Sequence, residues 1–153
     1  MKVTFTLNGL KTVCEISPSA SLLETLREKG VSSVRSGCDT TNCGICTVWV
    51  DDKPVLSCSY PAARAEGRTV TTLEGIRAEA EPILKALAEE GADQCGFCSP
   101  GFIMTIAAML RDHETMTDDE IRAYLSGNLC RCTGYMSQMR AIRKLFDERR
   151  AAK

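Results

Sequence analysis

The sequence is poor in histidine, in net charge and in long apolar runs. Its 19 lysine and arginine residues nearly balance its 20 aspartate and glutamate residues. A chain so close to neutral lacks the basic surface that nucleic acids and anionic membranes attract, so we expect neither as a partner. No apolar run approaches the roughly 20 residues of a transmembrane helix, which argues against membrane insertion. The single histidine, His113, cannot form a histidine-based site, and we expect it to be a solvated loop residue.

The motifs of a self-contained enzyme are also missing. The sequence has no candidate pair of nucleophile and base, and no glycine-rich loop for a dinucleotide. Its 153 residues leave room for one domain or two small ones, and none for a further large domain. The first residues, MKVTFTLNG, alternate polar and apolar side chains and then turn, so we expect a strand there and no secretory signal. The sequence therefore predicts a cytoplasmic protein with no catalytic residues of its own.

Cysteine, by contrast, is abundant, with nine residues. Because a cytosol keeps thiols reduced, so many cysteines indicate metal ligands before disulfides. The first set has the C-x4-C-x2-C spacing of a plant-type [2Fe–2S] ferredoxin, and its members are Cys38, Cys43, Cys46 and the more distant Cys58. Zinc loops favour paired C-x2–4-C knuckles, which match this spacing poorly. An anionic cluster needs backbone N–H groups close to its sulfurs, and we expect Gly37 and Gly44 to allow that approach.

A second set of cysteines consists of two pairs, Cys95 with Cys98 and Cys130 with Cys132. Each pair precedes a predicted helix, so one end of a helical domain can bring the two pairs together. A helix N-terminus also favours a thiolate and an anionic cluster. The spacing alone leaves two readings open, a second iron–sulfur cluster or a tetrahedral zinc ion, although one residue between two thiolates is awkward for zinc. The ninth cysteine, Cys14, is expected to be a buried or edge-strand thiol.

The two halves of the sequence predict different secondary structure. The first half predicts strands at 3–7, 10–16, 47–50, 54–57 and 69–73, with a type I′ turn at Asn8-Gly9 and a helix that begins after Ser21 and ends at Gly30. The second half predicts helices at 79–90, 100–112, 118–125 and 136–150. Strands followed by helices indicate the α+β class, with a small mixed sheet, a compact helical bundle and a join near residues 74–80.

Three stretches carry a family resemblance: GCDTTNCGICTV at 37–48, QCGFCSPG at 94–101 and GNLCRCTGY at 127–135. In this order they resemble the small iron–sulfur subunit of molybdenum hydroxylases, the family of xanthine dehydrogenase, aldehyde oxidoreductase and aerobic carbon monoxide dehydrogenase. The resemblance implies an N-terminal β-grasp, plant-type ferredoxin-like domain over residues 1–75. It also implies a C-terminal four-helix bundle domain over residues 76–153, and one [2Fe–2S] cluster in each domain.

The resemblance further implies an order of cofactors. The cluster of the second set would lie nearer the molybdenum cofactor, and that of the first set nearer the flavin. Gln94 matches a family position that hydrogen-bonds the pterin, and Cys132 lies close to the same pterin. The chain departs from many members at Thr41, where they have glycine, and at Ile45, where they have alanine. The threonine version is most similar to the carbon monoxide dehydrogenase branch, and Ile45 predicts a first cluster better shielded from water.

The stretch GYMSQM at 134–139 also differs from the commoner pattern after Gly-Tyr, so the substrate branch stays open. We expect an electron-transfer subunit that relays electrons from a large molybdopterin-binding subunit to a medium FAD-binding subunit. One alternative is a free-standing ferredoxin-like carrier, which would be strongly acidic. Another is a zinc-stapled binding module, which would be colourless.

We expect Trp49 in core or subunit-contact packing, and the basic residues of 140–150 on a solvated helix face or in contact with a partner.

Overall fold

The first half of the chain folds into a five-stranded mixed sheet. The computed structural model describes residues 1–152, so the last residue of the expected second domain lies outside it. The strands are β1 (Lys2–Leu7), β2 (Leu10–Glu15), β3 (Thr47–Val50), β4 (Lys53–Leu56) and β5 (Thr69–Thr71), in the spatial order β2-β1-β5-β3-β4. Neighbouring strands are antiparallel except β1 and β5, which are parallel. The predicted mixed sheet is confirmed.

Turn chemistry sets the register of both hairpins. Asn8 and Gly9 have φ of 49° and 85°, the positive values that a type I′ turn requires. This turn pairs Leu7 with Leu10 and runs the register back to Lys2 opposite Glu15. In the second hairpin, Asp51 and Asp52 also have positive φ, and Val50 pairs with Lys53.

Helix α1 (Leu22–Glu28) covers the sheet, and its start is the predicted capping box. The backbone N–H of Glu24 donates to Ser21 Oγ at 3.2 Å, and Glu24 Oε2 accepts from the N–H of Ser21 at 2.8 Å. Leu22 and Leu26 are fully buried on the side that faces the sheet. They share a hydrophobic core with Val3, Phe5, Val48 and Val70.

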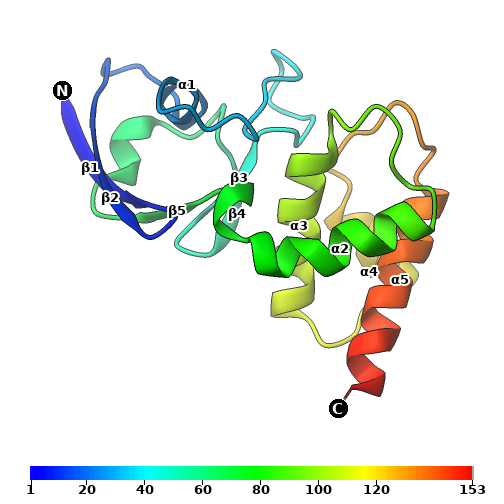
Figure 1. Cartoon of the computed structure of the whole chain (residues 1–153). Helices are drawn as coiled ribbons and strands as arrows, with labels where there is room; N and C mark the ends of the chain where they lie inside the picture. The colour runs from blue at the N-terminus through cyan, green and yellow to red at the C-terminus, as the bar shows by residue number, and fades with distance from the viewer. Residues whose placement is uncertain (153) are drawn as a thin grey trace.

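The second half contains α2 (Arg77–Glu89), α3 (Ser99–Asp112), α4 (Asp118–Tyr124) and α5 (Met136–Ala151). Every residue of α3 from Pro100 to Leu110 is buried, so α3 is the central helix of this half. It lies next to β3 and β4, α2 packs across it, and α5 packs against α2 (Figure 1). Two 3-10 helices, Ala62–Ala65 and Leu73–Gly75, precede the second half. The predicted helices are confirmed within two residues at each end, and the α+β class is therefore observed.

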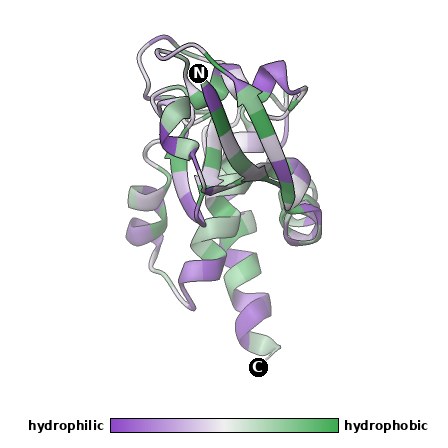
Figure 2. Cartoon of the chain, turned by 90° about the vertical axis from the view of Figure 1, so that its left-hand side faces the viewer, coloured by the Kyte–Doolittle hydropathy of each residue, from purple (hydrophilic) through white to green (hydrophobic). Residues whose placement is uncertain are grey.

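Helix α5 carries the basic stretch of the C-terminus, and in Figure 2 its last turns alternate between purple and green. As expected, its cations lie on a partly to fully exposed face, and four of them form ion pairs there. The ion pairs are Arg140–Glu90, Arg143–Asp118, Lys144–Glu89 and Arg150–Asp147. Three of these four acceptors lie on α4 or at the end of α2, so the charges fasten α5 to its neighbours.

Trp49 joins the two halves. Although it belongs to β3, it packs in the core of the helical half and is 5% exposed. Its Nε1 donates to the carbonyl oxygen of Met104 on α3 at 3.0 Å, and the Arg111 guanidinium lies 4.5 Å from its ring centroid. The expectation of core packing is confirmed, and the core that Trp49 enters is that of the helical half.

A polar network fixes the join itself. Thr72 exchanges two hydrogen bonds with Asn8: its backbone N–H donates to Asn8 Oδ1, and its Oγ1 accepts from Asn8 Nδ2, both at 2.9 Å. Its hydroxyl donates to Glu74, which also accepts from the Ser33 hydroxyl at 2.7 Å. Burial opposes ionisation of Glu74, but these hydroxyl groups hold its pKa below the usual value. The turn after β1 and the loop after α1 are therefore tied to the start of the second half.

Candidate metal centres

The first cysteine set gathers at one end of the sheet. Three of its members lie on the loop between α1 and β3, and the fourth follows β4. Cys43 and Cys46 are buried, whereas Cys38 and Cys58 are partly exposed. The sulfur atoms affect one another's ionisation in two neighbouring pairs, Cys38 with Cys43 and Cys46 with Cys58. The loop and the hairpin thus bring together all four residues that the spacing singled out.

The loop backbone favours a thiolate at Cys38. A hydrogen bond from the Cys43 thiol, together with the backbone N–H groups of Asn42, Cys43 and Thr40, lowers the pKa of Cys38 to about 6. Burial acts in the opposite direction on two other members. It raises the pKa of Cys43, and with the neighbouring Cys46 it raises the pKa of Cys58 to about 12. Four crowded thiols resist ionising together, so metal ions would supply the charge that stabilises four thiolates.

The second cysteine set gathers beside the N-terminus of α3. Cys98 is the residue before this helix, and the other pair lies on the loop between α4 and α5. Cys95 and Cys132 are exposed, with their Sγ atoms 3.5 Å apart. Cys98 and Cys130 form the inner pair, and burial with the neighbouring Cys130 raises the pKa of Cys98 to about 12.

Cys130 is the best hydrogen-bonded sulfur of the second set. Burial alone would raise its pKa, but the Thr133 hydroxyl and the backbone N–H groups of Thr133 and Cys132 lower the pKa of Cys130. The Thr133 hydroxyl donates to Cys130 Sγ at 3.2 Å. The N–H of Cys130 in turn donates to Tyr135 Oη at 2.7 Å. Tyr135 has φ of 68°, so the chain makes a left-handed turn between this loop and α5.

The donor sets fit a two-iron cluster. In such a cluster four thiolates are shared between two iron ions, so each iron takes two sulfurs. Both sets present their sulfurs as two close pairs. Within residues 1–152, no group of three or more His, Cys, Asp or Glu side chains is placed to hold one metal ion.

Gly37 and Gly44 occupy crowded positions, where an added side chain would clash with its neighbours. A Cβ at Gly37 would lie 2.4 Å from Ile45 Cδ1 and 3.4 Å from Cys43 Sγ. Gly44 has φ of 70°, and a Cβ there would lie 2.2 Å from the carbonyl oxygen of Gly127. Gly44 therefore permits the approach of the second ligand loop to the first.

The two ligand loops touch through their backbones. The N–H of Leu129 donates to the carbonyl oxygen of Cys43 at 2.9 Å. The buried Asn128 amide lies 3.4 Å from the carbonyl oxygen of Gly44, and a Cβ at Gly101 of α3 would lie 2.3 Å from the same oxygen. Sequence reasoning missed Gly101 and Asn128, although both lie inside the quoted motifs.

Arg35 makes a second connection that the sequence did not suggest. Its Nη1 donates to the carbonyl oxygens of Gly96 and Phe97 at 2.7 and 3.1 Å. Its guanidinium also lies 5.3 Å from the centre of the Phe97 ring. The first half thereby holds the turn between Cys95 and Cys98.

The outer side of the second set is open to solvent. Gln94, next to Cys95, is exposed, as is Cys132. Three large apolar side chains close to the same ligands in the sequence are also exposed, namely Phe97 at 45%, Leu129 at 47% and Met136 at 62%. The inner side, through Leu129 and Cys43, faces the first set.

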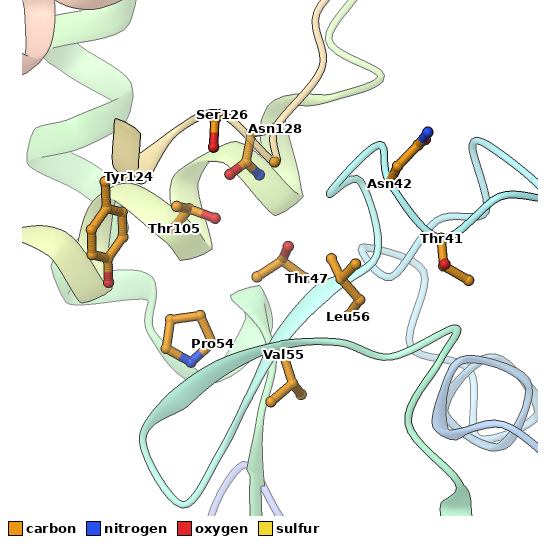
Figure 3. A pocket seen from close by; sticks show the side chains of 11 residues that line it. Thr41, Asn42, Thr47, Pro54, Val55, Leu56, Thr105, Tyr124, Ser126 and Asn128 are labelled. Atoms are coloured by element: carbon orange, nitrogen blue, oxygen red, sulfur yellow. The ribbon is translucent and has the colours of Figure 1, made fainter. Parts of the chain in front are cut away.

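A cleft of about 580 Å³ lies between the second hairpin and helices α3 and α4 (Figure 3). Thr47 and Leu56 line it from the hairpin, and Thr105, Tyr124 and Asn128 line it from the helical half. The side chains that line it carry no carboxylate, lysine, arginine or histidine. It therefore offers no acid–base pair.

Two further residues were singled out in the sequence. Cys14 is only 2% exposed, and burial raises its pKa. It lies on β2, opposite Val3, within the core of the sheet. His113 is exposed directly after α3, with its ring 5.8 Å from that of Tyr124. Both sit where the sequence analysis expected.

Two family patterns match the chain. One is described as a 2Fe-2S iron-sulfur cluster binding domain and covers residues 5–73, and the other as a [2Fe-2S] binding domain and covers residues 72–143. The nicotinate dehydrogenase small FeS subunit of Eubacterium barkeri is 42% identical over 144 residues, 92% of each chain. The xanthine dehydrogenase iron-sulfur-binding subunit of Escherichia coli O157:H7 is 47% identical over 134 residues, 85% of this chain and 84% of that one. This chain belongs to the iron–sulfur subunits of the molybdenum hydroxylases.

A solved structure agrees with this membership in the molybdenum hydroxylase family. Quinoline 2-oxidoreductase from Pseudomonas putida 86 contains a chain that is 34% identical, with a TM-score of 0.88 over 99% of this chain and 96% of that one. As an iron–sulfur subunit of this family, the chain serves electron transfer through [2Fe–2S] centres. None of the helices within residues 1–152 has the length and apolar character needed to cross a bilayer.

Proposed function

We propose that this subunit relays electrons from a molybdopterin-binding large subunit, through two [2Fe–2S] clusters, to an FAD-binding medium subunit. Each cluster, when bound, would take up and return one electron at a time. The residues of this chain hold the sulfurs, shield them from water and connect the two sites. The substrate would be oxidised on another polypeptide, because the chain offers only ligands and packing residues.

The proposal divides the chain at residue 75. Residues 1–75 would form a β-grasp, plant-type ferredoxin-like domain, and residues 76–153 a four-helix bundle domain. The strand order β2-β1-β5-β3-β4 with α1 across the sheet supports the first domain. A largely separate hydrophobic core around α3 supports the second. The two matched family patterns also meet at residues 72–73.

Eight cysteines would be the ligands, four for each cluster. Their sulfur contacts support a distribution over the irons. Cys38 and Cys43 would hold one iron of the first cluster, and Cys46 and Cys58 the other. Cys95 with Cys132, and Cys98 with Cys130, would hold the two irons of the second cluster. Gly37 would keep Ile45 close to Cys43, which supports a first cluster shielded from water.

The backbone contact between the two ligand loops is the observation that best supports the proposed electron relay. From Cys43 to Cys130 the path is covalent except for one hydrogen bond, from the Leu129 N–H to the Cys43 carbonyl oxygen at 2.9 Å. Residues 43 and 130 belong to different ligand sets. A protein with two independent metal sites would not need its two ligand loops to share a peptide contact.

Exposure supports the direction of transfer. The second set has its Cys95–Cys132 pair and Gln94 open to solvent, so a pterin on a partner could approach this pair. Gln94 would donate or accept a hydrogen bond to that pterin. We propose a cytoplasmic location, because eight thiols that must remain reduced to bind iron require a reducing compartment.

The test uses the assembled enzyme with Cys46→Ser in this subunit. Substrate should still reduce the second cluster, which gives one EPR signal in a rapid-freeze sample, but turnover with a flavin-linked acceptor should stop. A separate metal analysis of the wild-type chain should find about four iron and four sulfide ions per chain, with negligible zinc. Recovery of half that iron with zinc in the remainder, or purification of the chain as a free carrier without partners, would contradict the proposal.

A further inference from the structure

Gln138 is a buried amide in an apolar setting. It lies on the first turn of α5 and is 3% exposed, and with Phe102 it lines two cavities of about 440 and 230 Å³. A buried amide is costly unless it is hydrogen-bonded. Its Oε1 lies 3.0 Å from Thr133 Oγ1, and this hydroxyl is also 3.2 Å from Cys130 Sγ. Gln138 is therefore one side chain removed from a sulfur of the second set.

The hydrogen-bond capacity of Thr133 decides what Gln138 can do. A threonine hydroxyl has one proton to donate and two lone pairs to accept. The backbone N–H of Tyr135 already donates to one lone pair, at 3.3 Å. The proton can go either to Cys130 Sγ or to Gln138 Oε1, but not fully to both.

If Cys130 is a thiolate ligand, the Thr133 hydroxyl donates its proton to the Cys130 sulfur rather than to Gln138 Oε1. A metal-bound Cys130 sulfur is anionic and only accepts hydrogen bonds, so it draws the Thr133 proton. The second lone pair of Thr133 is then free for a donor. A half-turn of the Gln138 amide exchanges its oxygen and its NH2 group, and the NH2 group becomes that donor. The adjoining cavities give the amide room to turn.

We propose that Gln138 is a positioning residue that, through Thr133, directs a hydrogen bond onto the Cys130 sulfur and raises the reduction potential of the second cluster. The chain of donors runs from Gln138 Nε2 to Thr133 Oγ1 to Cys130 Sγ. Donors in series polarise one another, and hydrogen bonds to ligand sulfurs stabilise the more negative, reduced cluster. The inference rests on the proposed ligand role of Cys130. It would ease entry of an electron at the second cluster.

The test is an EPR-monitored redox titration of the iron-loaded chain, in which the first cluster is the internal reference. Thr133→Val should shift the potential of the second cluster to more negative values and leave the first unchanged. Gln138→Leu should shift it in the same direction by less. The double variant should match Thr133→Val alone, because Gln138 acts only through the hydroxyl.

Two further variants separate this role from packing. Thr133→Ser keeps the hydroxyl and should restore the wild-type potential. Met139→Leu changes the side chain next to Gln138, which lines the same cavity, and should shift neither potential. Resonance Raman iron–thiolate bands should move on transfer to D2O in the wild type, and less so in Thr133→Val.

The outcomes are distinct. A positive shift in Gln138→Leu would mean that the amide withdraws the proton, and would overturn the inference, as would additive shifts in the double variant. These comparisons are made on variants that show the EPR signals of both clusters. If the iron-loaded wild-type chain itself lacked the second signal and the corresponding iron, the proposed ligand set would be contradicted.

Discussion

The nine cysteine side chains are chemically identical, but their surroundings differ. At the scale of single residues, these surroundings distinguish the cysteines that bind metal from the one that only packs. Cys14 lies in the sheet core, with burial opposing its ionisation. Cys38 lies on a loop whose N–H groups point at its sulfur. A thiolate binds metal, and a buried thiol packs as a small apolar side chain.

Substitution should reveal this difference directly. Cys14→Ser should leave iron content and both EPR signals unchanged, and should lower the free energy of unfolding by about 1–3 kcal/mol because a hydroxyl replaces a thiol in an apolar core. Cys43→Ser should remove the first cluster and spare the second. Iron analysis and EPR of the two variants check this, and loss of iron in Cys14→Ser would show that the ligand sets are misassigned.

The lowered pKa of Cys38 makes a prediction for the iron-free chain. Because its pKa is about 6, Cys38 is mostly thiolate at pH 7, whereas Cys58, with a pKa of about 12, stays protonated. Alkylation by iodoacetamide should therefore label Cys38 before Cys58 above pH 6 and slow as the pH falls through that value. Mass spectrometry of timed samples at pH 5 to 8 measures this, and equal labelling of the two residues would contradict it.

Between elements, the contact of the ligand loops depends on one N–H group. Leu129→Pro removes that group, and with it the hydrogen bond to the Cys43 carbonyl oxygen. Electron transfer between the clusters should slow, while both clusters remain bound. Leu129→Ala keeps the N–H and is the matched control. Rapid-freeze EPR of the assembled enzyme checks this, and equal rates in the two variants would show that the route lies elsewhere.

Elements that depend on local patterns could be predicted from the sequence, and contacts between elements could not. Asn8-Gly9 demands a type I′ turn whatever surrounds it, and the Ser21 capping box is complete within four residues. Gly44 was expected to allow a close backbone approach, but nothing in the sequence indicates that Gly127 is a residue that approaches it. Asn128 and Gly44 are 84 residues apart, and no periodicity or spacing within one motif encodes such a meeting.

For the molecule as a whole, the two halves behave as one unit because α3 packs directly on the first ligand loop. Gly101 is buried at the place where α3 meets the carbonyl oxygens of Gly44 and Ile45. Trp49 enters the helical core from the other half. Neither half can shift without breaking these contacts, so we expect a single unfolding transition.

Two glycine variants test this coupling. A Cβ at Gly101 would lie 2.3 Å from Gly44 O and 2.7 Å from Ile45 O, backbone atoms that cannot turn aside. Alanine favours a helix by about 1 kcal/mol over glycine, but overpacking costs about 1–3 kcal/mol and should outweigh this gain. Gly101→Ala should therefore destabilise the chain. Gly127→Ala has open space around its Cβ and should change stability little. Urea unfolding followed by circular dichroism measures both, and equal stability would show that the loops can separate freely.

Peptide groups rather than side chains make the contact between the two ligand loops. A hydrogen bond from Leu129 N–H to the Cys43 carbonyl involves no rotamers, and the missing Cβ atoms at Gly44 and Gly101 leave no space for the loops to slide. The spacing between the two sites is therefore rigid on the timescale of electron tunnelling. The rate of electron transfer between the two clusters should therefore be insensitive to solvent viscosity. Adding glycerol would slow encounters with outside partners and leave this intramolecular rate unaltered.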